Sequence, residues 1–525
     1  KSISIYGNTI TTVTKYDNFG NVIEKTGSDS EKLEYSYDHI LRNTCISSNG
    51  ETITKTSYTA NGLPQNVTSC GNTISYKYDC RNKITNIDSD LFSEKITYLD
   101  GEKYYGGKIK KLESEIKADS KTDPPNKMSY ELEYDGCGQL SSAICSEYEE
   151  ASMKNITYDK NGNIISYNDT EKIKLEAGTD KVKTTGHNTY EYNANGAVSK
   201  ISGNKNISVD YYPYSRLPKK FTTDDCDINI VYDDNGKRLK KTVNKKDGSK
   251  LSKIYLYEGK RLTEEIADGK NKKYIYGTSG INAVLQDGKK ISVITDRLGY
   301  TRVVAESKKI IQAYHYKPFG EVLKIIEESQ LVNMLFGGFE LDSETDLYYA
   351  KARLYDPKLL RFLSTDPQGE FSSPYTFCGN DPFSIIDENG EASWIGALIG
   401  AVVGIVLTIG LTLITAGVGV AVLPVAASGV VAGEATAVAA EATLTAGQIA
   451  AHIFYNMAAA SLVAAASGFA SEGVRCLVDG ESFAAESAYG ILLSSAVTGL
   501  VFGGFAKGLD FLIEKASKAA ICVTR

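Results

Sequence analysis

The chain has 525 residues, which is long enough for more than one domain and a large hydrophobic core. Its formal net charge of −7 argues against nucleic-acid binding by the chain as a whole, because neutralising phosphates requires a basic face. The sequence begins with Lys1 rather than Met, so we expect a fragment or a processed product and draw nothing from the absence of a signal peptide.

The residue types that bind metals or form common hydrolase sites are scattered. The nine cysteines form no CxxC motif and no cluster with histidine, which argues against a structural zinc site. Free thiols are favoured, with a disulfide framework as the alternative. No GxSxG, Walker or HExxH pattern occurs, and His39, His187 and His452 lack partners at ligand or triad spacing. We therefore expect no metal and no cofactor.

Residues 1–260 contain a repeat. Three of its units read KYDNFGNVIEKT (15–26), TYDKNGNIISY (157–167) and VYDDNGKRLKKT (231–242). Each unit has an anchor tyrosine, and these tyrosines form two sets, one in residues 16–78 and one in residues 192–232. Neighbouring anchors within each set lie 20 or 21 residues apart, a period typical of repeat architectures. The anchors are Tyr16, Tyr37, Tyr58, Tyr78, Tyr192, Tyr212 and Tyr232.

Each unit has the composition of a β-hairpin. An aromatic residue and an Asp or Asn lead into a turn such as Asn161-Gly162 or Asn195-Gly196, and apolar and polar residues then alternate. A single hairpin cannot bury its apolar face alone, so the units must stack into a long sheet that twists and curls. Residues 101–150 interrupt the repeat with a charged, proline-containing insert that we expect to be a surface loop.

These units resemble the YD repeats of the Rhs family, which also includes the C component of insecticidal toxin complexes and the teneurin shell. The resemblance covers about residues 1–392 and rests on the series of units rather than on any one of them. It implies a mainly β fold, in which a spiral of antiparallel hairpins forms a hollow shell around a cargo polypeptide. The alternative is an open solenoid or a wall-attached adhesive repeat.

An approach segment follows the repeats. Residues 296–299 read DRLG and residues 314–320 read YHYKPFG, and the family has a similar pair just ahead of its core domain. His315 is a candidate catalytic base, but it lies in a strand-like Tyr-His-Tyr alternation. Packing or a hydrogen bond is therefore the favoured interpretation of this histidine.

The segment 337–390 is dense in Asp, Arg, Pro and Gly. It contains RLYDP (353–357), RFLSTDP (361–367) and NDP (380–382), and it closes with DENG (387–390). This order resembles the Rhs repeat-associated core domain, whose members cut their own chain just beyond it and release the C-terminal segment inside the shell. Carried over by position, the resemblance implies Asp366 and Asp387 as the cutting pair, with Arg353 placing or stabilising one carboxylate.

The chemistry of these residue types is consistent with that implication. Two carboxylates held close together do not ionise equally, so that one can activate water while the other donates a proton. A guanidinium beside them can hold one carboxylate in its ionised form. The structural alternative is that Asp356, Asp366 and Asp387 simply begin turns.

The end of the segment departs from the family pattern. The family usually closes with Asp-Pro-x-Gly followed by Leu, whereas residues 387–392 read DENGEA. The key Asp and Gly remain, and we expect cleavage between Gly390 and Trp394. The candidate cleavage region consists of Gly390, Glu391, Ala392, Ser393 and Trp394.

No charged residue occurs from 392 to 433, and this run contains two stretches of about 20 apolar residues, each long enough to span a bilayer. Spaced glycines in the run permit close helix packing, and Trp394 fits a membrane interface. Residues 434–525 continue as Ala-rich material of helical character, without a visible nuclease or ADP-ribosylating site. The alternative is a soluble helical hairpin, or a chain kept unfolded inside the shell.

We therefore expect a YD-repeat β-shell (1–336), a self-cleaving core (337–392) and an α-helical, hydrophobic cargo or translocation segment (393–525). The function implied by the resemblance is the shell of a secreted or cell-surface bacterial polymorphic toxin. It would act once on its own chain as an aspartyl-type autoprotease. Its expected partners are its own C-terminal segment, an immunity protein, secretion machinery and a membrane, with no nucleic acid for residues 1–392. The rival function is a surface-displayed adhesion or interaction protein with a membrane-anchoring tail.

Overall fold

The computed structural model describes most of the chain up to residue 395. The described residues are 2–5, 8–11, 13–27, 31–99, 107–118, 122–169, 171–259, 261–277, 280–387, 389–391, 393–395, 414–415 and 418–419. The chain divides into two compact units, 1–100 with 107–428 and 101–106 with 429–525, and every described element belongs to the first. Of the expected helical tail (393–525), only three short pieces are described, and they are strands: β39 (Ser393–Ile395), β40 (Ile414–Thr415) and β41 (Val418–Gly419). The rest of that prediction lies outside the described residues. Within them, no helix has the length and apolar composition needed to cross a bilayer.

Two large antiparallel sheets contain most of the strands. The first sheet has twelve strands, in the order β14 to β3. They are β3 (Val13–Tyr16), β4 (Val22–Thr26), β5 (Lys32–Tyr37), β6 (Asn43–Ser48), β7 (Glu51–Tyr58), β8 (Pro64–Ser69), β9 (Asn72–Tyr78), β10 (Ile84–Asp88), β11 (Phe92–Tyr98), β12 (Ile109–Ile116), β13 (Lys127–Tyr134) and β14 (Leu140–Cys145).

The second sheet has sixteen strands, in which each strand pairs with the next along the chain. They are β18 (Lys174–Leu175), β19 (Val182–Thr184), β20 (Asn188–Tyr192), β21 (Val198–Gly203), β22 (Ile207–Tyr211), β23 (Pro218–Thr223), β24 (Cys226–Tyr232), β25 (Arg238–Lys245), β26 (Lys250–Glu258), β27 (Arg261–Ala267), β28 (Lys270–Gly277), β29 (Gly280–Gln286), β30 (Lys289–Thr295), β31 (Thr301–Glu306), β32 (Lys309–Tyr316) and β33 (Val322–Glu327).

Smaller elements join and follow these sheets. The segment from Phe336 onward has only short ones: η2 (Phe336–Gly338), β34 (Glu340–Asp342), β35 (Leu347–Tyr349), β36 (Leu354–Asp356), β37 (Arg361–Phe362), η3 (Cys378–Asn380), β38 (Ile385–Asp387) and β39 (Ser393–Ile395). The others are β1 (Ser2–Ile5), β2 (Asn8–Thr11), η1 (Glu149–Ala151), β15 (Thr157–Tyr158), β16 (Ile164–Tyr167), β17 (Glu171–Lys172), β40 (Ile414–Thr415) and β41 (Val418–Gly419).

The Asp of each YD unit organises the hairpin turn. The carboxylate of Asp79 accepts hydrogen bonds from the backbone N–H groups of Arg81 and Lys83, both at 2.9 Å. A carboxylate that binds the amides two and four residues later fixes the loop, as Asx turns do. The same pair of bonds recurs at Asp17, Asp38, Asp135, Asp159, Asp233 and Asp296.

The Tyr of the unit connects one hairpin to the strand before it. The Tyr78 hydroxyl donates to the carbonyl oxygen of Pro64 at 2.7 Å, and its ring packs against the hydrophobic core. Equivalent bonds run from Tyr37, Tyr58, Tyr98, Tyr158 and Tyr211 to carbonyl groups in the preceding strands. The repeat therefore encodes both the turn and the contact between neighbouring units.

The prediction of a surface loop over residues 101–150 is wrong. Strands β12, β13 and β14 lie in this range and pair in the twelve-stranded sheet. The many charged residues of β12 hide an alternation in which Ile109, Leu112 and Ile116 are buried while neighbouring lysines are not. Tyr134 and Asp135 also form a YD unit that was not predicted.

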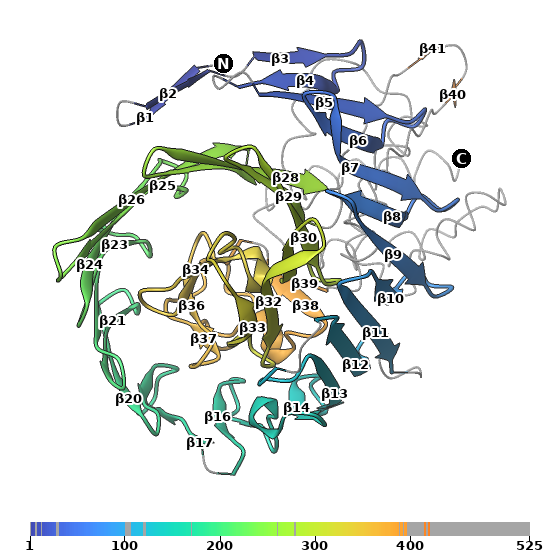
Figure 1. Ribbon diagram of the computed structural model, residues 1–525. Coiled ribbons are helices and arrows are strands. Elements are labelled where there is room, and N and C mark those ends of the chain that lie inside the picture. Colours follow the sequence, from blue (N-terminus) through green and yellow to red (C-terminus); the bar gives the residue numbers. More distant parts are fainter. Residues whose placement is uncertain are drawn as a thin grey trace, which may run out of the picture. The chain divides into compact units, whose positions relative to one another are not determined.

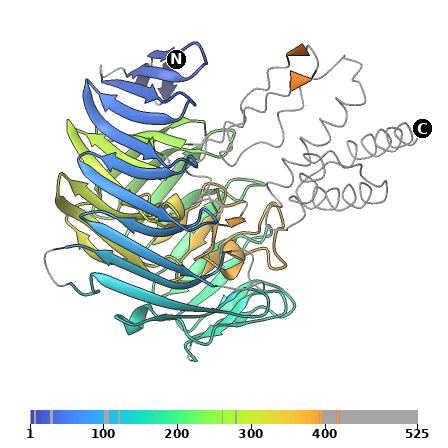
Figure 2. The ribbon, with the colours of Figure 1, turned by 90° about the vertical axis from the view of Figure 1, so that its right-hand side faces the viewer.

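The second sheet curves so far that its later strands lie beside early strands of the first (Figure 1). The Asn72 side chain donates to the carbonyl oxygen of Ser307 at 2.7 Å, and Lys273 pairs with Glu31 at 2.8 Å. Ile46 and Ile275 belong to one small buried cluster. A view from the side shows the strands stacked one above another along the curved wall (Figure 2). This arrangement agrees with the predicted spiral of hairpins.

The segment from Phe336 to Glu391 lies on the concave side of the curved second sheet (Figure 1). Aromatic side chains join it to the approach segment: the Phe336 ring centroid is 5.6 Å from that of Tyr316 and 4.4 Å from that of Tyr300. One hydrophobic cluster extends from the strands of both sheets into this segment, so the segment shares the core of the β-structure. The seven cysteines in the described part are all free.

Candidate functional site

Hairpin turns of the repeats hold the 337–391 segment in place. Side chains of the segment donate to the carbonyl oxygens of four turn glycines at 2.7–3.0 Å. These pairs are Asn380 with Gly162, Tyr375 with Gly196, Tyr349 with Gly236 and Tyr348 with Gly320. Because the turns of successive units lie at one edge of the sheet, the repeat supplies a row of carbonyl acceptors for the segment.

A buried charge network ties strand β34 to the wall. Arg238 is fully buried and pairs with Glu340 at 2.8 Å and with Asp342 at 2.9 Å, while Lys241 binds Asp342 at 2.7 Å. The Tyr255 hydroxyl donates to Glu340 at 2.8 Å. The adjacent Arg238 and Lys241 hold the pKa of Asp342 well below its usual range, although burial alone would raise it. This network fixes the start of the segment.

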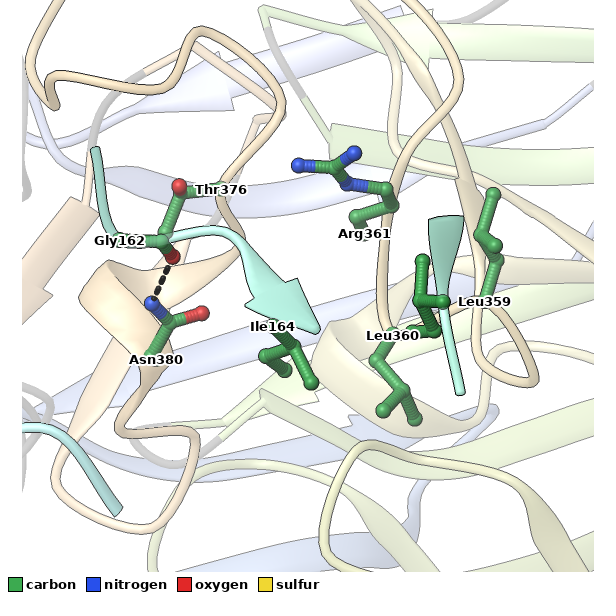
Figure 3. A pocket seen from close by; sticks show the side chains of 8 residues that line it. Gly162, Ile164, Leu359, Leu360, Arg361, Thr376 and Asn380 are labelled. Carbon is green, nitrogen blue, oxygen red and sulfur yellow. Dashed lines mark hydrogen bonds between the residues drawn. The ribbon is translucent and has the colours of Figure 1, made fainter. Parts of the chain in front are cut away.

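Arg361 forms a second anchor, at a small cavity of about 10 Å³ shown in Figure 3. Its guanidinium donates to the backbone carbonyl oxygen of Asp180 at 2.9 Å and to the side chains of Asn163 and Ser373. Burial lowers the pKa of this guanidinium, because its hydrogen-bond acceptors are uncharged. Arg361 therefore holds the segment against the repeat at Asn163 and Asp180.

Arg353 is the centre of the predicted site. It precedes β36, is 2 % exposed, and lies over the Phe362 ring with the guanidinium carbon 3.6 Å from the ring centroid. Nη2 is 3.4 Å from Oδ2 of Asp387, and Nη1 is 3.8 Å from Oδ1 of Asp366. The structure thus brings all three predicted residues together, although they come from separate parts of the segment.

Asp387 ends strand β38 and has a fully buried side chain. Its Oδ1 accepts the backbone N–H groups of Gly390 at 2.7 Å and Asn389 at 3.2 Å. Burial raises the pKa of Asp387, and Arg353 and these two amides only partly oppose the effect. Asp387 therefore retains its proton to a higher pH than an ordinary aspartate.

Asp366 both begins a turn and faces Arg353. Its carboxylate accepts the backbone N–H groups of Gln368 at 2.9 Å and Glu370 at 3.1 Å, and its side chain is 3 % exposed. The 3.8 Å separation from Nη1 of Arg353 exceeds a hydrogen bond, and Nη1 has no hydrogen-bond partner among the described residues. A buried donor and a carboxylate at this spacing can share one water molecule.

Two other candidates have structural roles. Asp356 caps a turn through the backbone N–H groups of Lys358 and Leu359, as the structural alternative stated. His315 is buried, with Nε2 2.8 Å from the carbonyl oxygen of Asn126 and Nδ1 3.4 Å from the Ser114 hydroxyl. Burial lowers the pKa of His315 to about 3, so it stays neutral. The interpretation of His315 as a packed, hydrogen-bonded residue is confirmed.

The candidate cleavage region is the turn of the β38–β39 hairpin. Asp387 pairs with Ser393 and Ile386 with Trp394 in its backbone register. Gly390 and Glu391 are described, whereas Ala392 lies outside the described residues. Arg238, Glu340 and Asp342 were not predicted as site residues; the two acids of GFELD (338–342) in a strand-like pattern were the available signal. No group of three or more metal-binding side chains occurs in the part of the chain that the structure describes.

Comparison with known proteins identifies a matching family and several relatives. A sequence model of the teneurin YD-shell family matches residues 72–377. The tRNA nuclease WapA of Bacillus subtilis is 26 % identical over 288 residues, which cover 49 % of this chain and 12 % of WapA. The salivary gland surface protein 1 of Aedes aegypti is 39 % identical over 84 residues, which cover 16 % of this chain and 2 % of that protein.

Among solved structures, the crystal structure of TcdB2-TccC3-Cdc42 matches with a TM-score of 0.56 and 15 % identity, covering 76 % of this chain and 22 % of that one. At this identity the match establishes the fold alone. The chain thus spans about a fifth of that structure's chain and about a tenth or less of the curated relatives it matches.

Proposed function

The chain belongs to the teneurin YD-shell family, and from this membership we propose that it is the shell of a bacterial Rhs-type polymorphic toxin. The shell encloses its own C-terminal segment and cuts the chain once, between Gly390 and Trp394. In this proposal residues 1–336 are the β-shell, 337–392 the self-cleaving core and 393–525 the released segment, which inserts in membranes.

The observation that carries this proposal is the position of Arg353 between Asp366 and Asp387, beside the turn that contains the candidate bond. Asp356, in the same segment, caps a turn without such a neighbour. A buried guanidinium between two carboxylates gives them unequal environments, which peptide hydrolysis by an acid–base pair requires.

The surroundings of the two aspartates indicate which one donates a proton and which one accepts it. Asp387, whose pKa is raised by burial, is the proton donor. Asp366 is held by two backbone amides, and its carboxylate takes a proton from the attacking water. The unpartnered Nη1 of Arg353 and Oδ1 of Asp366 together hold that water.

Partners and location follow from the same proposal. The C-terminal segment is the enclosed cargo, and an immunity protein and secretion machinery are further partners. We place the protein outside the producing cell or at its surface, and expect no nucleic acid to bind residues 1–392.

The test is the intact mass of the purified wild-type chain, Asp366→Asn and Asp387→Asn. The proposal predicts two fragments for the wild type and one intact mass for each variant. Asp356→Asn is the matched control, because it changes a buried aspartate of the same segment that does not touch Arg353; it should still be cut. A single intact mass for all four proteins would contradict self-cleavage.

The second candidate is a surface-displayed adhesion or interaction protein, favoured by the match to the Aedes salivary gland surface protein 1. An anchoring tail would be open to added protease in detergent, whereas an enclosed cargo would resist digestion until the β-structure unfolds. Limited proteolysis followed by fragment masses separates the two functions.

A further inference from the structure

Three parts of the chain meet at a small polar cavity of about 30 Å³. Its walls come from strands β11 to β13 of the first sheet, from the YD turn at residues 296–300 with the strands that follow it, and from residues 382–383. The Arg297 guanidinium crosses this junction and donates to the carbonyl oxygen of Phe383. A ligand in the cavity would therefore lie between the curved wall and the 337–391 segment.

The charged side chains at this cavity are buried, but they are not all in direct contact. Arg302 Nε donates to Oδ2 of Asp296 at 2.9 Å, which is a direct ion pair. Glu94 is 2 % exposed, yet its Oε1 is 3.9 Å from Nη2 of Arg302, a separation that exceeds a hydrogen bond. Its Oε2 accepts a long hydrogen bond of 3.4 Å from the backbone N–H of Arg297. Glu94 thus approaches its cationic neighbour without binding it directly.

Two more polar atoms at the cavity have no hydrogen-bond partner among the described residues. They are Nε of Arg297 and the hydroxyl oxygen of Tyr300, and both are buried. A buried donor without a partner has lost its hydration and gained no bond in return, so such groups are rare in native proteins. The two donors therefore indicate a ligand that accepts hydrogen bonds inside the cavity.

We propose that this cavity is a hydration site that joins the wall to the 337–391 segment through bound water. One water molecule requires about 10–15 Å³ of cavity volume, so the space is sufficient for about two. The water accepts hydrogen bonds from Arg297 and Tyr300, and it bridges the gap between Glu94 and Arg302.

The charges around the cavity favour water over an ion. An anion would accept from both unpartnered donors, but it would lie beside the carboxyl groups of Glu94 and Asp296 and could not donate to them. A cation would meet two guanidinium groups, and no group of three or more metal-binding side chains occurs in the described part of the chain. Water can accept from the two donors and donate to a carboxylate at the same time.

The direct test is a crystal structure of the full chain at a resolution that shows ordered water. The crystals are grown in sodium bromide, and data are collected at the bromine absorption edge. The expected result is water density within hydrogen-bond distance of Arg297 Nε and of the Tyr300 hydroxyl, without an anomalous peak. An empty cavity, or an anomalous peak from bromide in it, would overturn the proposal. Every lining residue precedes Gly390, so the result does not depend on whether the chain cuts itself.

Tyr300→Phe tests the same site in solution. If water binds the hydroxyl group, its removal loses a hydrogen bond, and the unfolding equilibrium constant from urea denaturation should rise about 5-fold. A hydroxyl group that faces a dry cavity would instead destabilise the folded state, and its removal would lower this constant. A constant that is unchanged or lower in Tyr300→Phe would contradict the proposal.

Two other tyrosines serve as controls for this measurement. Tyr316→Phe removes a hydroxyl group that donates directly to the carbonyl oxygen of Thr301, from a ring at the same cavity, and should raise the constant by a similar factor. Tyr214→Phe removes a hydroxyl group from a fully exposed side chain and should leave the constant unchanged, because that group is hydrated in both the folded and the unfolded chain.

Discussion

Aspartate side chains serve two purposes in this chain. Asp79 and Asp356 organise turns through backbone amides, whereas Asp387 does so while also facing a buried guanidinium. Local sequence identifies each as a turn former but does not reveal which carboxylate lies next to Arg353. That distinction arises only when the 337–391 segment packs against the wall, so motif order, not residue type, was the informative signal.

At this scale the first prediction concerns the pH dependence of cleavage. Burial raises the pKa of Asp387 above the ordinary aspartate value of 3.8, and the proposed mechanism uses its protonated form. The proton donor is present below that raised pKa and is lost as pH rises through it, so the rate should fall on the alkaline side. A pH–rate profile of fragment formation measures this. A rate that rises steadily from pH 5 to 9 would contradict the assigned role.

A second residue prediction tests the YD unit. Asp79→Ala leaves the N–H groups of Arg81 and Lys83 without their acceptor and should lower the free energy of unfolding by about 1–2 kcal/mol. Tyr78→Phe removes the bond to Pro64 but keeps the ring, and should cost about 1 kcal/mol. Urea denaturation of both variants measures these losses. Lys55→Ala, at an exposed position of β7, is the control and should stay within about 0.5 kcal/mol of the wild type.

At the scale of elements, the hairpins were predictable because each unit carries its own turn and strand signals. The repeat period predicted that consecutive strands would be neighbours, and the two large antiparallel sheets have this strand order. Strand β12 was missed because lysines and glutamates on its outer face obscured the buried Ile109, Leu112 and Ile116. The anchoring network of Arg238 and Lys241 with β34 was not predictable, since it joins side chains about a hundred residues apart.

Breaking the charge network of Arg238 should make the start of the 337–391 segment more mobile. Arg238→Ala leaves Glu340 and Asp342 buried without their main counter-charge, which costs about 3–5 kcal/mol in comparable buried pairs. We expect faster amide hydrogen exchange in residues 340–349 and slower self-cleavage. Lys220→Ala, which removes an exposed ion pair with Asp227 on the same sheet, is the control and should change neither. Unaltered exchange in Arg238→Ala would contradict the anchoring role.

A second element prediction concerns β11 and the approach segment, which meet at a small polar cavity of about 30 Å³. Burial, with the nearby Asp296, raises the pKa of Glu94 there to about 7, and Arg302 and Arg297 only partly oppose the shift. Because the folded pKa exceeds the unfolded value, Glu94 contributes stability that is present below about pH 4.5 and lost as pH rises through 7.

Glu94→Gln should abolish this dependence. The difference in unfolding free energy between variant and wild type should therefore change by about 3 kcal/mol between pH 4.5 and pH 7, in favour of the variant at the higher pH. Urea denaturation at several pH values measures it. A difference that stays constant across this range would show that Glu94 titrates normally.

At the scale of the whole molecule, the series of YD units in the sequence predicted a YD-repeat shell, and the fold and the family membership confirm this prediction. The curvature that brings late strands beside early ones depends on long-range contacts such as Asn72 with Ser307, which no local pattern encodes. The three predicted site residues do meet. Self-cleavage and enclosure of the C-terminal segment remain proposals.

The most direct test of the central claim follows cleavage as the chain is made. The full chain is synthesised in a cell-free system, synthesis is stopped, and fragment formation is timed by mass spectrometry at several dilutions. If the cutting site is part of the fold, the chain should be cut once, at a rate that does not depend on dilution. Asp366→Asn and Asp387→Asn should not be cut. A chain that stays intact, or a rate that falls in proportion to dilution, would contradict the claim that the chain cuts itself.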